Sequence, residues 1–282
     1  MKNKLSVLFI VLLIFSSQSS FIIQKSSSAE APDWKLAYQS FTFKNFTFEE
    51  GLQKAKELGL DYVEAYRAQK LTAENSKQTH FDSDEATLEE MKQLLNKYQI
   101  KMINYGVVKG KNQQEWKRIF EFARKMGVET LVAEPEPSQF DFLEKLCDEY
   151  NINIAIHNHP QPSRYWEPDS VLKYASGRSH RIGACADVGH WVRSGLNPVE
   201  CLKKLEGRII SIHFKDLNEN GRDAHDVPWG TGISNVPAML QELKKQGFKG
   251  VFSIEYEYNW DNNVPEIAQS IEYFNKTSAN LK

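Results

Sequence analysis

Three apolar runs in the C-terminal half of the chain each end in acidic residues or histidine, and this pattern constrains the fold most. They cover residues 182–191 (IGACADVGHW), 209–216 (IISIHFKD) and 251–257 (VFSIEYE). Short apolar runs of this kind are typical of buried parallel strands. Asp187, His213 and Glu255 lie where the predicted strands end. Because parallel strands end at the same edge of a sheet, we expect these three side chains to converge.

The same alternation of a short apolar run with a longer amphipathic segment occupies most of the chain. Further strands are predicted over residues 36–43, 62–66, 100–108, 130–135 and 152–159. Amphipathic segments such as 84–98 and 113–126 predict the intervening helices, and Thr47 with Glu50 forms a capping box that starts the first one. Eight consecutive strand–helix units indicate an α/β protein with a closed (β/α)8 TIM barrel as a single domain.

A doubly wound open sheet is the alternative architecture. It fits less well because polar residues end many different strands instead of gathering at one crossover point. No predicted strand leads into a Gly-rich phosphate loop that opens a helix. The turn Gly230-Thr231-Gly232 matches no dinucleotide fingerprint. We interpret it as a turn or as a loop that closes over a substrate.

Residues 1–29 have the pattern of a secretory signal peptide. Lys2 and Lys4 precede an apolar run over residues 5–15, and a serine-rich stretch ends at Ala29. A transmembrane anchor is the alternative, but a spanning helix needs about 20 apolar residues. We therefore predict a barrel domain over residues 30–282, exported to a bacterial periplasm, with no stable membrane insertion after cleavage.

The charge balance argues against a nucleic-acid partner. The chain has 37 acidic and 35 basic residues, for a formal net charge of −2. The predicted leader contains three lysines and no acidic residue, so the remaining chain is more acidic than the whole. A mildly acidic surface attracts polyanions poorly.

Imidazole and carboxylate groups at neighbouring strand ends are suitable ligands for a divalent cation. We predict one cation held by Asp187, His213, Glu255 and a fourth donor, for which His157 is the first candidate. Strand alternation places small residues inward beneath three of these positions, namely Cys185, Ser211 and Ser253. Any one of the ligands alone would be explained as a cap or a salt-bridge partner. Nitrogen and oxygen donors together accept Mn, Co, Zn, Fe or Mg, so the metal is not specified.

A group that carries a proton is expected beside the cation. The candidate catalytic residues are Glu134, His157, His159 and Glu255. His157 and His159 share one face of their strand, so one can bind the metal while the other contacts the substrate or orients its neighbour. Glu134 ends the fourth strand, where it is a metal ligand, a proton carrier or a cap for a helix beginning near Ser138.

Aromatic and polar side chains near the strand ends are candidates for contact with a carbohydrate. Aromatic rings can stack on the C–H faces of a sugar, although core packing is the alternative for each of them. The predicted substrate-binding residues are Tyr105, His190, Trp191, Lys215, His225 and Trp229, and further aromatic candidates are Tyr38, Phe41, Tyr66, Trp166 and Trp260.

Three motifs resemble the xylose isomerase-like barrels. They are Asp187-Val188-Gly189-His190-Trp191, His213-Phe214-Lys215-Asp216 and Ser253-Ile254-Glu255. That superfamily includes sugar isomerases and epimerases, inosose dehydratases and endonuclease IV. The resemblance implies a metal-dependent enzyme that removes a proton next to the carbonyl of a keto-sugar or inosose. The predicted export favours an unphosphorylated substrate.

One departure from the family pattern affects the expected reaction. In the epimerases the fifth strand usually supplies a glutamate where this chain has His157, and the resemblance therefore favours hydratase or dehydratase chemistry. An endonuclease IV-like phosphodiesterase is one alternative, with Asp223 and His225 as additional ligands. However, the predicted second and third strands lack the histidines that such a site needs. A sugar-binding barrel without turnover is the other alternative. The sequence does not indicate an oligomeric state.

Overall fold

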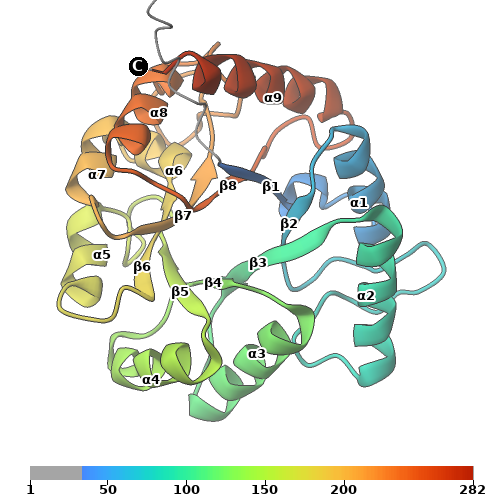
Figure 1. Cartoon of the computed structure of the whole chain (residues 1–282). Coiled ribbons are helices and arrows are strands. Elements are labelled where there is room, and N and C mark those ends of the chain that lie inside the picture. Colours follow the sequence, from blue (N-terminus) through green and yellow to red (C-terminus); the bar gives the residue numbers. More distant parts are fainter. Residues whose placement is uncertain (1–33, 282) are drawn as a thin grey trace, which may run out of the picture.

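The computed structural model describes residues 34–281, and its centre is a closed barrel of eight parallel strands (Figure 1). Each strand pairs with the next in sequence, and the last pairs with the first, so the sheet has no free edge. The predicted TIM barrel is therefore confirmed. The predicted signal peptide lies outside the described residues. The strands are β1 (Lys35–Gln39), β2 (Tyr62–Ala65), β3 (Lys101–Val108), β4 (Thr130–Ala133), β5 (Asn153–His157), β6 (Ile182–Asp187), β7 (Ile209–Phe214) and β8 (Val251–Ile254).

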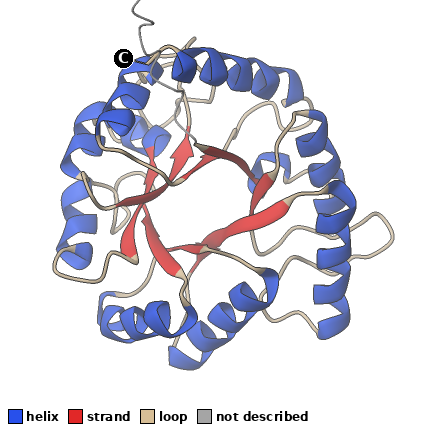
Figure 2. Ribbon diagram, viewed as in Figure 1, coloured by secondary structure: helices blue, strands red, loops and turns tan. Residues whose placement is uncertain are grey.

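Helices form a ring outside the strands (Figure 2). The capping box predicted at Thr47 and Glu50 is present at the start of the first α-helix. None of the helices within residues 34–281 combines the length and the apolar character that a membrane span requires. The helices are η1 (Ser40–Phe43), α1 (Phe48–Glu57), α2 (Glu85–Tyr98), α3 (Gln113–Met126), η2 (Pro137–Gln139), α4 (Phe140–Tyr150), α5 (Pro168–Ala175), α6 (Val188–Arg193), α7 (Pro198–Lys204), α8 (Val236–Lys245) and α9 (Val264–Ala279).

Two of the predicted strands continue as a helix before their apolar runs end. The run over residues 182–191 stops being a strand at Asp187, and the remainder forms α6. Asp187 is the N-cap of this helix, and its Oδ1 accepts a hydrogen bond from the His190 amide at 2.8 Å. The run over residues 36–43 likewise turns into η1 after Gln39. Apolar composition alone did not reveal either change, because a buried short helix has the same composition as a buried strand.

Small side chains lie beneath three of the predicted ligand positions, as the strand alternation predicted. Cys185, Ser211 and Ser253 are fully buried. Between the strands and the outer helices lies the main hydrophobic core, which includes large rings such as Trp116 and Phe120 of α3. The narrow interior leaves space for polar side chains at the end of the barrel where the strands finish.

Candidate metal centre

Four side chains meet where β5, β6, β7 and β8 end. His157 and Asp187 are the last residues of β5 and β6, His213 is the penultimate residue of β7, and Glu255 follows β8 directly. Asp187 is in register with His213, and His213 with Ser253, so the barrel places these positions side by side. All four residues are buried, and one ligand atom from each lies within 4.8 Å of the others. The structure thus brings together the four residues predicted as metal ligands.

Each of these side chains has one buried polar atom that makes no hydrogen bond within residues 34–281. The atoms are His157 Nε2, Asp187 Oδ2, His213 Nδ1 and Glu255 Oε2. Buried polar atoms almost always have a partner, because leaving one unsatisfied costs about 1–3 kcal/mol. Four such atoms facing one another indicate a group that binds among them.

The spacing of these atoms fits a divalent cation. Asp187 Oδ2 lies 3.6 Å from His157 Nε2 and 3.7 Å from His213 Nδ1, and Glu255 Oε2 lies 3.0 Å from His213 Nδ1. Tetrahedral ligands at about 2.0–2.2 Å from a metal are about 3.3–3.6 Å apart. Two imidazole nitrogens and two carboxylate oxygens are therefore arranged as a mixed N/O site for one cation.

The remaining atoms of three of these residues are held by neighbouring groups. His157 Nδ1 lies 3.2 Å from Glu134 Oε1, and the Asp187 backbone exchanges two hydrogen bonds with the Asn158 side chain. His213 Nε2 lies 2.7 Å from Glu64 Oε1. These contacts fix the tautomers, because an imidazole that donates from one nitrogen presents the lone pair of the other.

Glu64 is a residue that sequence reasoning missed. It lies in the middle of β2, is fully buried, and also accepts hydrogen bonds from Ser253 Oγ at 2.7 Å and Asn104 Nδ2 at 3.3 Å. The sequence signal that could have identified it is a glutamate inside a short, otherwise uncharged strand. β2 contains no histidine of the kind that a three-metal site would need, but it supplies this carboxylate behind His213.

Lys215 places an ammonium group directly beside the cluster. Its Nζ lies 3.0 Å from Asp187 Oδ2, 2.7 Å from Glu255 Oε2 and 2.7 Å from Glu257 Oε2, although the first two contacts lack hydrogen-bond geometry. Burial lowers the pKa of Lys215, but the three carboxylates outweigh it and raise the pKa well above the ordinary value. The lysine therefore stays charged. Burial raises the pKa of Asp187, but the neighbouring His190 and Lys215 outweigh it and hold this pKa well below its ordinary value.

The guanidinium of Arg193 connects the loop between β7 and α8 to the site. The Arg193 guanidinium of α6 donates to Asp226 Oδ2 at 3.1 Å and to Glu257 Oε2 at 2.9 Å. Burial raises the pKa of Asp226 to about 7, against the opposing effect of nearby Lys215 and Arg193. Asp216 accepts from the amides of Gly230, Gly232 and Ser234, so the predicted Gly-Thr-Gly turn is held by this carboxylate.

Glu134 faces the two histidines of the β5 end. Its Oε1 contacts Nδ1 of both His157 and His159, and its Oε2 lies 2.6 Å from Lys109 Nζ. Burial raises the pKa of Glu134, but the two histidines outweigh it and hold the pKa far below the ordinary value. The alternative of a helix cap is wrong, because Glu136 caps η2 and Gln139 precedes α4. Glu134 orients the histidines instead.

A cavity of about 210 Å³ opens onto these groups. His157, His159, His190 and Glu255 line it, together with Phe41 and Tyr66 and with residues that were not predicted as site residues. Burial lowers the pKa of His190 well below its ordinary value, so its ring is neutral. The other lining residues are Gln39, Arg67, Ala68, Val107 and Glu257.

Five of the six predicted substrate-binding residues do not line this cavity, and one of the five, Lys215, lies beside the metal cluster instead. Tyr105 and Trp229 are buried in the hydrophobic core, where Tyr105 donates to Thr79 O and Trp229 packs against Phe214. Trp191 is also a core residue, and the His225 ring stacks on Tyr258. The predicted substrate contacts of these residues are not supported by their positions. Among the other aromatic candidates, Phe41 and Tyr66 reach the cavity.

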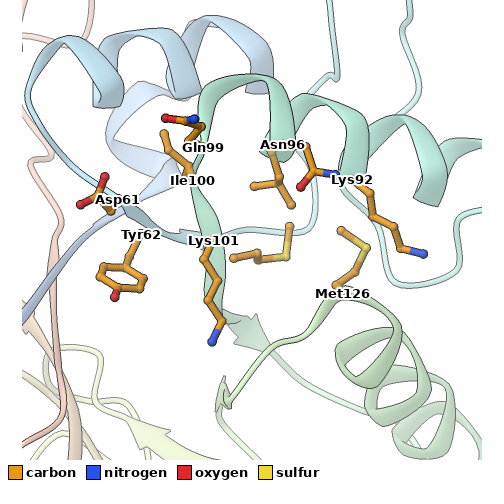
Figure 3. Close-up of a pocket in the computed structure, with 10 residues that line it drawn as sticks. Asp61, Tyr62, Lys92, Asn96, Gln99, Ile100, Lys101 and Met126 are labelled. Carbon is orange, nitrogen blue, oxygen red and sulfur yellow. The ribbon is translucent and has the colours of Figure 1, made fainter.

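A larger cavity, of about 630 Å³, lies at the opposite end of the barrel (Figure 3). It is lined by residues that precede or begin β2 and β3, including Asp61, Tyr62, Gln99 and Lys101. Neither of the two groups of potential metal ligands within the described part of the chain contributes to it. Active sites of TIM barrels lie at the C-terminal ends of the strands, so this cavity is not the candidate site.

Residues 52–277 match the family described as xylose isomerase-like TIM barrels. The chain belongs to this family. A solved structure of an uncharacterised protein from Parabacteroides distasonis ATCC 8503 is 38% identical, with a TM-score of 0.72, over 86% of this chain and 99% of that chain. A structure of the IolI protein with a bound zinc atom is 18% identical, with a TM-score of 0.69, over 88% of this chain and 99% of that chain. At that identity the likeness to IolI shows the fold alone.

Inosose dehydratases are among the relatives of this xylose isomerase-like barrel. That of Mesomycoplasma hyopneumoniae (strain 7448) is 24% identical over 156 residues, which are 49% of this chain and 50% of that protein. The chain spans about half the length of the curated relatives it matches. Within residues 34–281, Asp223 and His225 belong to neither group of potential metal ligands, so the extra ligands of an endonuclease IV-like site are not assembled.

Proposed function

We propose that this barrel is a divalent-metal-dependent enzyme that removes a proton next to the carbonyl of an unphosphorylated keto-sugar or inosose. The observation that carries the proposal is the convergence of four buried ligand atoms that make no hydrogen bond, from His157, Asp187, His213 and Glu255. A zinc atom in the related IolI structure and the inosose dehydratases among the relatives support it. Export to a periplasm belongs to the same proposal.

The chain's own residues account for binding and for proton movement. When bound, a divalent cation polarises a substrate carbonyl and lowers the cost of removing the neighbouring C–H proton. Lys215 forms ion pairs with the carboxylates of Asp187 and Glu255 and so holds both side chains in position. His190 lines the same cavity as a neutral ring and is available to hydrogen-bond a hydroxyl group.

His159 is the proton carrier that the geometry supports best. Its Nδ1 contacts Glu134, which leaves Nε2 as the proton-accepting nitrogen, and the ring lines the cavity. By contrast, both nitrogens of His157 are directed at other groups, Glu134 and the metal cluster. A histidine oriented by a carboxylate is a common general base. The same nitrogen can return the proton to a leaving hydroxyl, which is why we favour hydratase or dehydratase chemistry over epimerisation.

The function is tested by solvent exchange. Purified protein is incubated in deuterated water with keto-sugars and inososes, with Mn²⁺ or with a chelator, and C–H exchange is followed by NMR. We expect exchange that requires metal and that falls about 10²–10⁴-fold in His159→Gln, with unchanged Mn²⁺ affinity. His180→Gln, in the turn before β6, is the matched control. Absence of metal-dependent exchange across the panel contradicts the proposal.

Glu64 is expected to set metal affinity without touching the metal. Replacing it by glutamine removes the charged acceptor that orients His213 and leaves the size of the side chain unchanged. Loss of such a partner typically weakens metal binding about 10–100-fold. Titration of the metal-free variant with Zn²⁺ in a calorimeter measures the metal affinity. The control is Glu57→Gln, which changes an exposed residue at the end of α1. Equal affinity in the variant and the wild type would mean that Glu64 is only a packing residue.

A further inference from the structure

Arg67 stands apart from the other arginines of the chain. It follows β2 and lines the cavity beside the metal cluster. Its guanidinium makes no hydrogen bond or ion pair with any residue between positions 34 and 281. The other arginines all donate to a carboxylate, a side-chain amide or a backbone carbonyl; they are Arg118, Arg124, Arg164, Arg178, Arg181, Arg193, Arg208 and Arg222.

The acidic residues of the same cavity already have partners. Glu255 faces Lys215 and His213, and Glu257 faces Lys215 and Arg193. Arg67 is therefore not needed to neutralise either carboxylate by direct contact. A guanidinium offers five N–H donors in a planar fork, which matches the two oxygens of a carboxylate.

The position of Arg67 defines where the carboxylate of a bound ligand would lie. In the closed order of eight strands, β2 is four strands from β6, which ends in Asp187. A ligand that reaches both Arg67 and Asp187 therefore crosses the mouth of the barrel. Phe41 and Tyr66 line the same cavity, with ring centroids 5.4 Å apart, and offer an apolar wall for the C–H face of a sugar ring.

We infer that the cavity accepts a sugar acid, with its carboxylate on Arg67 and its carbonyl end at the metal cluster. The inference rests on the proposed function and narrows its substrate class. A phosphate ester is the less suitable anion, because phosphates are usually held by several donors or by a helix N-terminus. Lys109, another cation near the site, is already paired with Glu134.

The test compares matched pairs of sugars that differ only in a carboxylate. Binding of D-glucuronate and D-glucose, and of D-galacturonate and D-galactose, is measured by calorimetry on the Mn²⁺-loaded protein. The variants are Arg67→Gln and, as a control for net charge, Arg124→Gln, whose arginine pairs with Glu121 on the surface of α3. Glucose 6-phosphate is measured in parallel.

We expect at least one acid to bind about tenfold or more tightly than its neutral partner, as a charged hydrogen-bonded pair predicts. Arg67→Gln should remove most of this advantage without changing the affinity for the neutral sugar, and Arg124→Gln should preserve it. The inference is overturned if no acid has an advantage, if Arg67→Gln weakens acid and neutral sugar alike, or if the phosphate binds most tightly. The Mn²⁺ affinity separates the two proposals: failure to bind Mn²⁺ contradicts the proposed function, whereas Mn²⁺ binding without acid preference contradicts only this inference.

Discussion

Replacing Asp187 by asparagine is expected to lower the affinity for divalent cations by more than about 100-fold and to abolish metal-dependent proton exchange. Asp187 Oδ2 faces both candidate histidine ligands, at 3.6 Å from His157 Nε2 and 3.7 Å from His213 Nδ1. Removing a metal ligand costs at least as much affinity as removing a group that only orients one. The asparagine keeps an oxygen acceptor for the His190 amide, so the start of α6 is preserved.

Calorimetric titration with Mn²⁺ and Zn²⁺ measures the Asp187→Asn effect, and circular dichroism checks the fold. Asp141→Asn, on the exposed surface of α4, is the matched control and is expected to bind metal as the wild type does. Wild-type affinity in Asp187→Asn would mean that the four converging atoms are not a metal site.

Replacing Lys215 by methionine is expected to destabilise the metal-free protein by about 3–5 kcal/mol, because it removes a buried cation from three carboxylates, of which only Glu257 keeps an arginine partner. The loss should be smaller with metal bound, since a divalent cation would neutralise two of them, Asp187 and Glu255. Urea unfolding in EDTA and in Mn²⁺ measures both free energies of unfolding.

The control for Lys215→Met is a substitution of another lysine nearby in the sequence. Lys203→Met changes an exposed lysine that pairs with Glu200, and no change in the free energy of unfolding is expected. A loss that is equal with and without metal would show that Lys215 serves packing of the barrel and has no electrostatic link to the cluster.

The sequence was sufficient to predict the barrel and the convergence of His157, Asp187, His213 and Glu255. The barrel follows from eight consecutive strand–helix units, and the convergence follows because the parallel strands of a closed barrel end at the same rim. A polar residue at the end of an apolar run therefore has a predictable place, even when its neighbours around the rim lie far away in the sequence. The role of each residue in a reaction remains a proposal.

Other parts of the site depend on features that periodicity does not specify. Tyr105 follows Asn104, which contacts Glu64 inside the barrel, so Tyr105 faces the helices instead of the cavity. Its direction could have been found only by fixing the phase of the strand alternation. Arg193 and Asp226 meet because α6 and the loop after β7 are folded together, and the path of a loop is set by tertiary contacts such as those of Asp216.

The central claim is that one divalent cation is bound among these four side chains, and crystallography with added Mn²⁺ tests it most directly. We expect one anomalous difference peak at about 2.0–2.4 Å from His157 Nε2, Asp187 Oδ2, His213 Nδ1 and Glu255 Oε2. If no peak appears among these atoms at millimolar Mn²⁺ or Zn²⁺, or if the four side chains point away from one another, the proposed metal-dependent chemistry is contradicted.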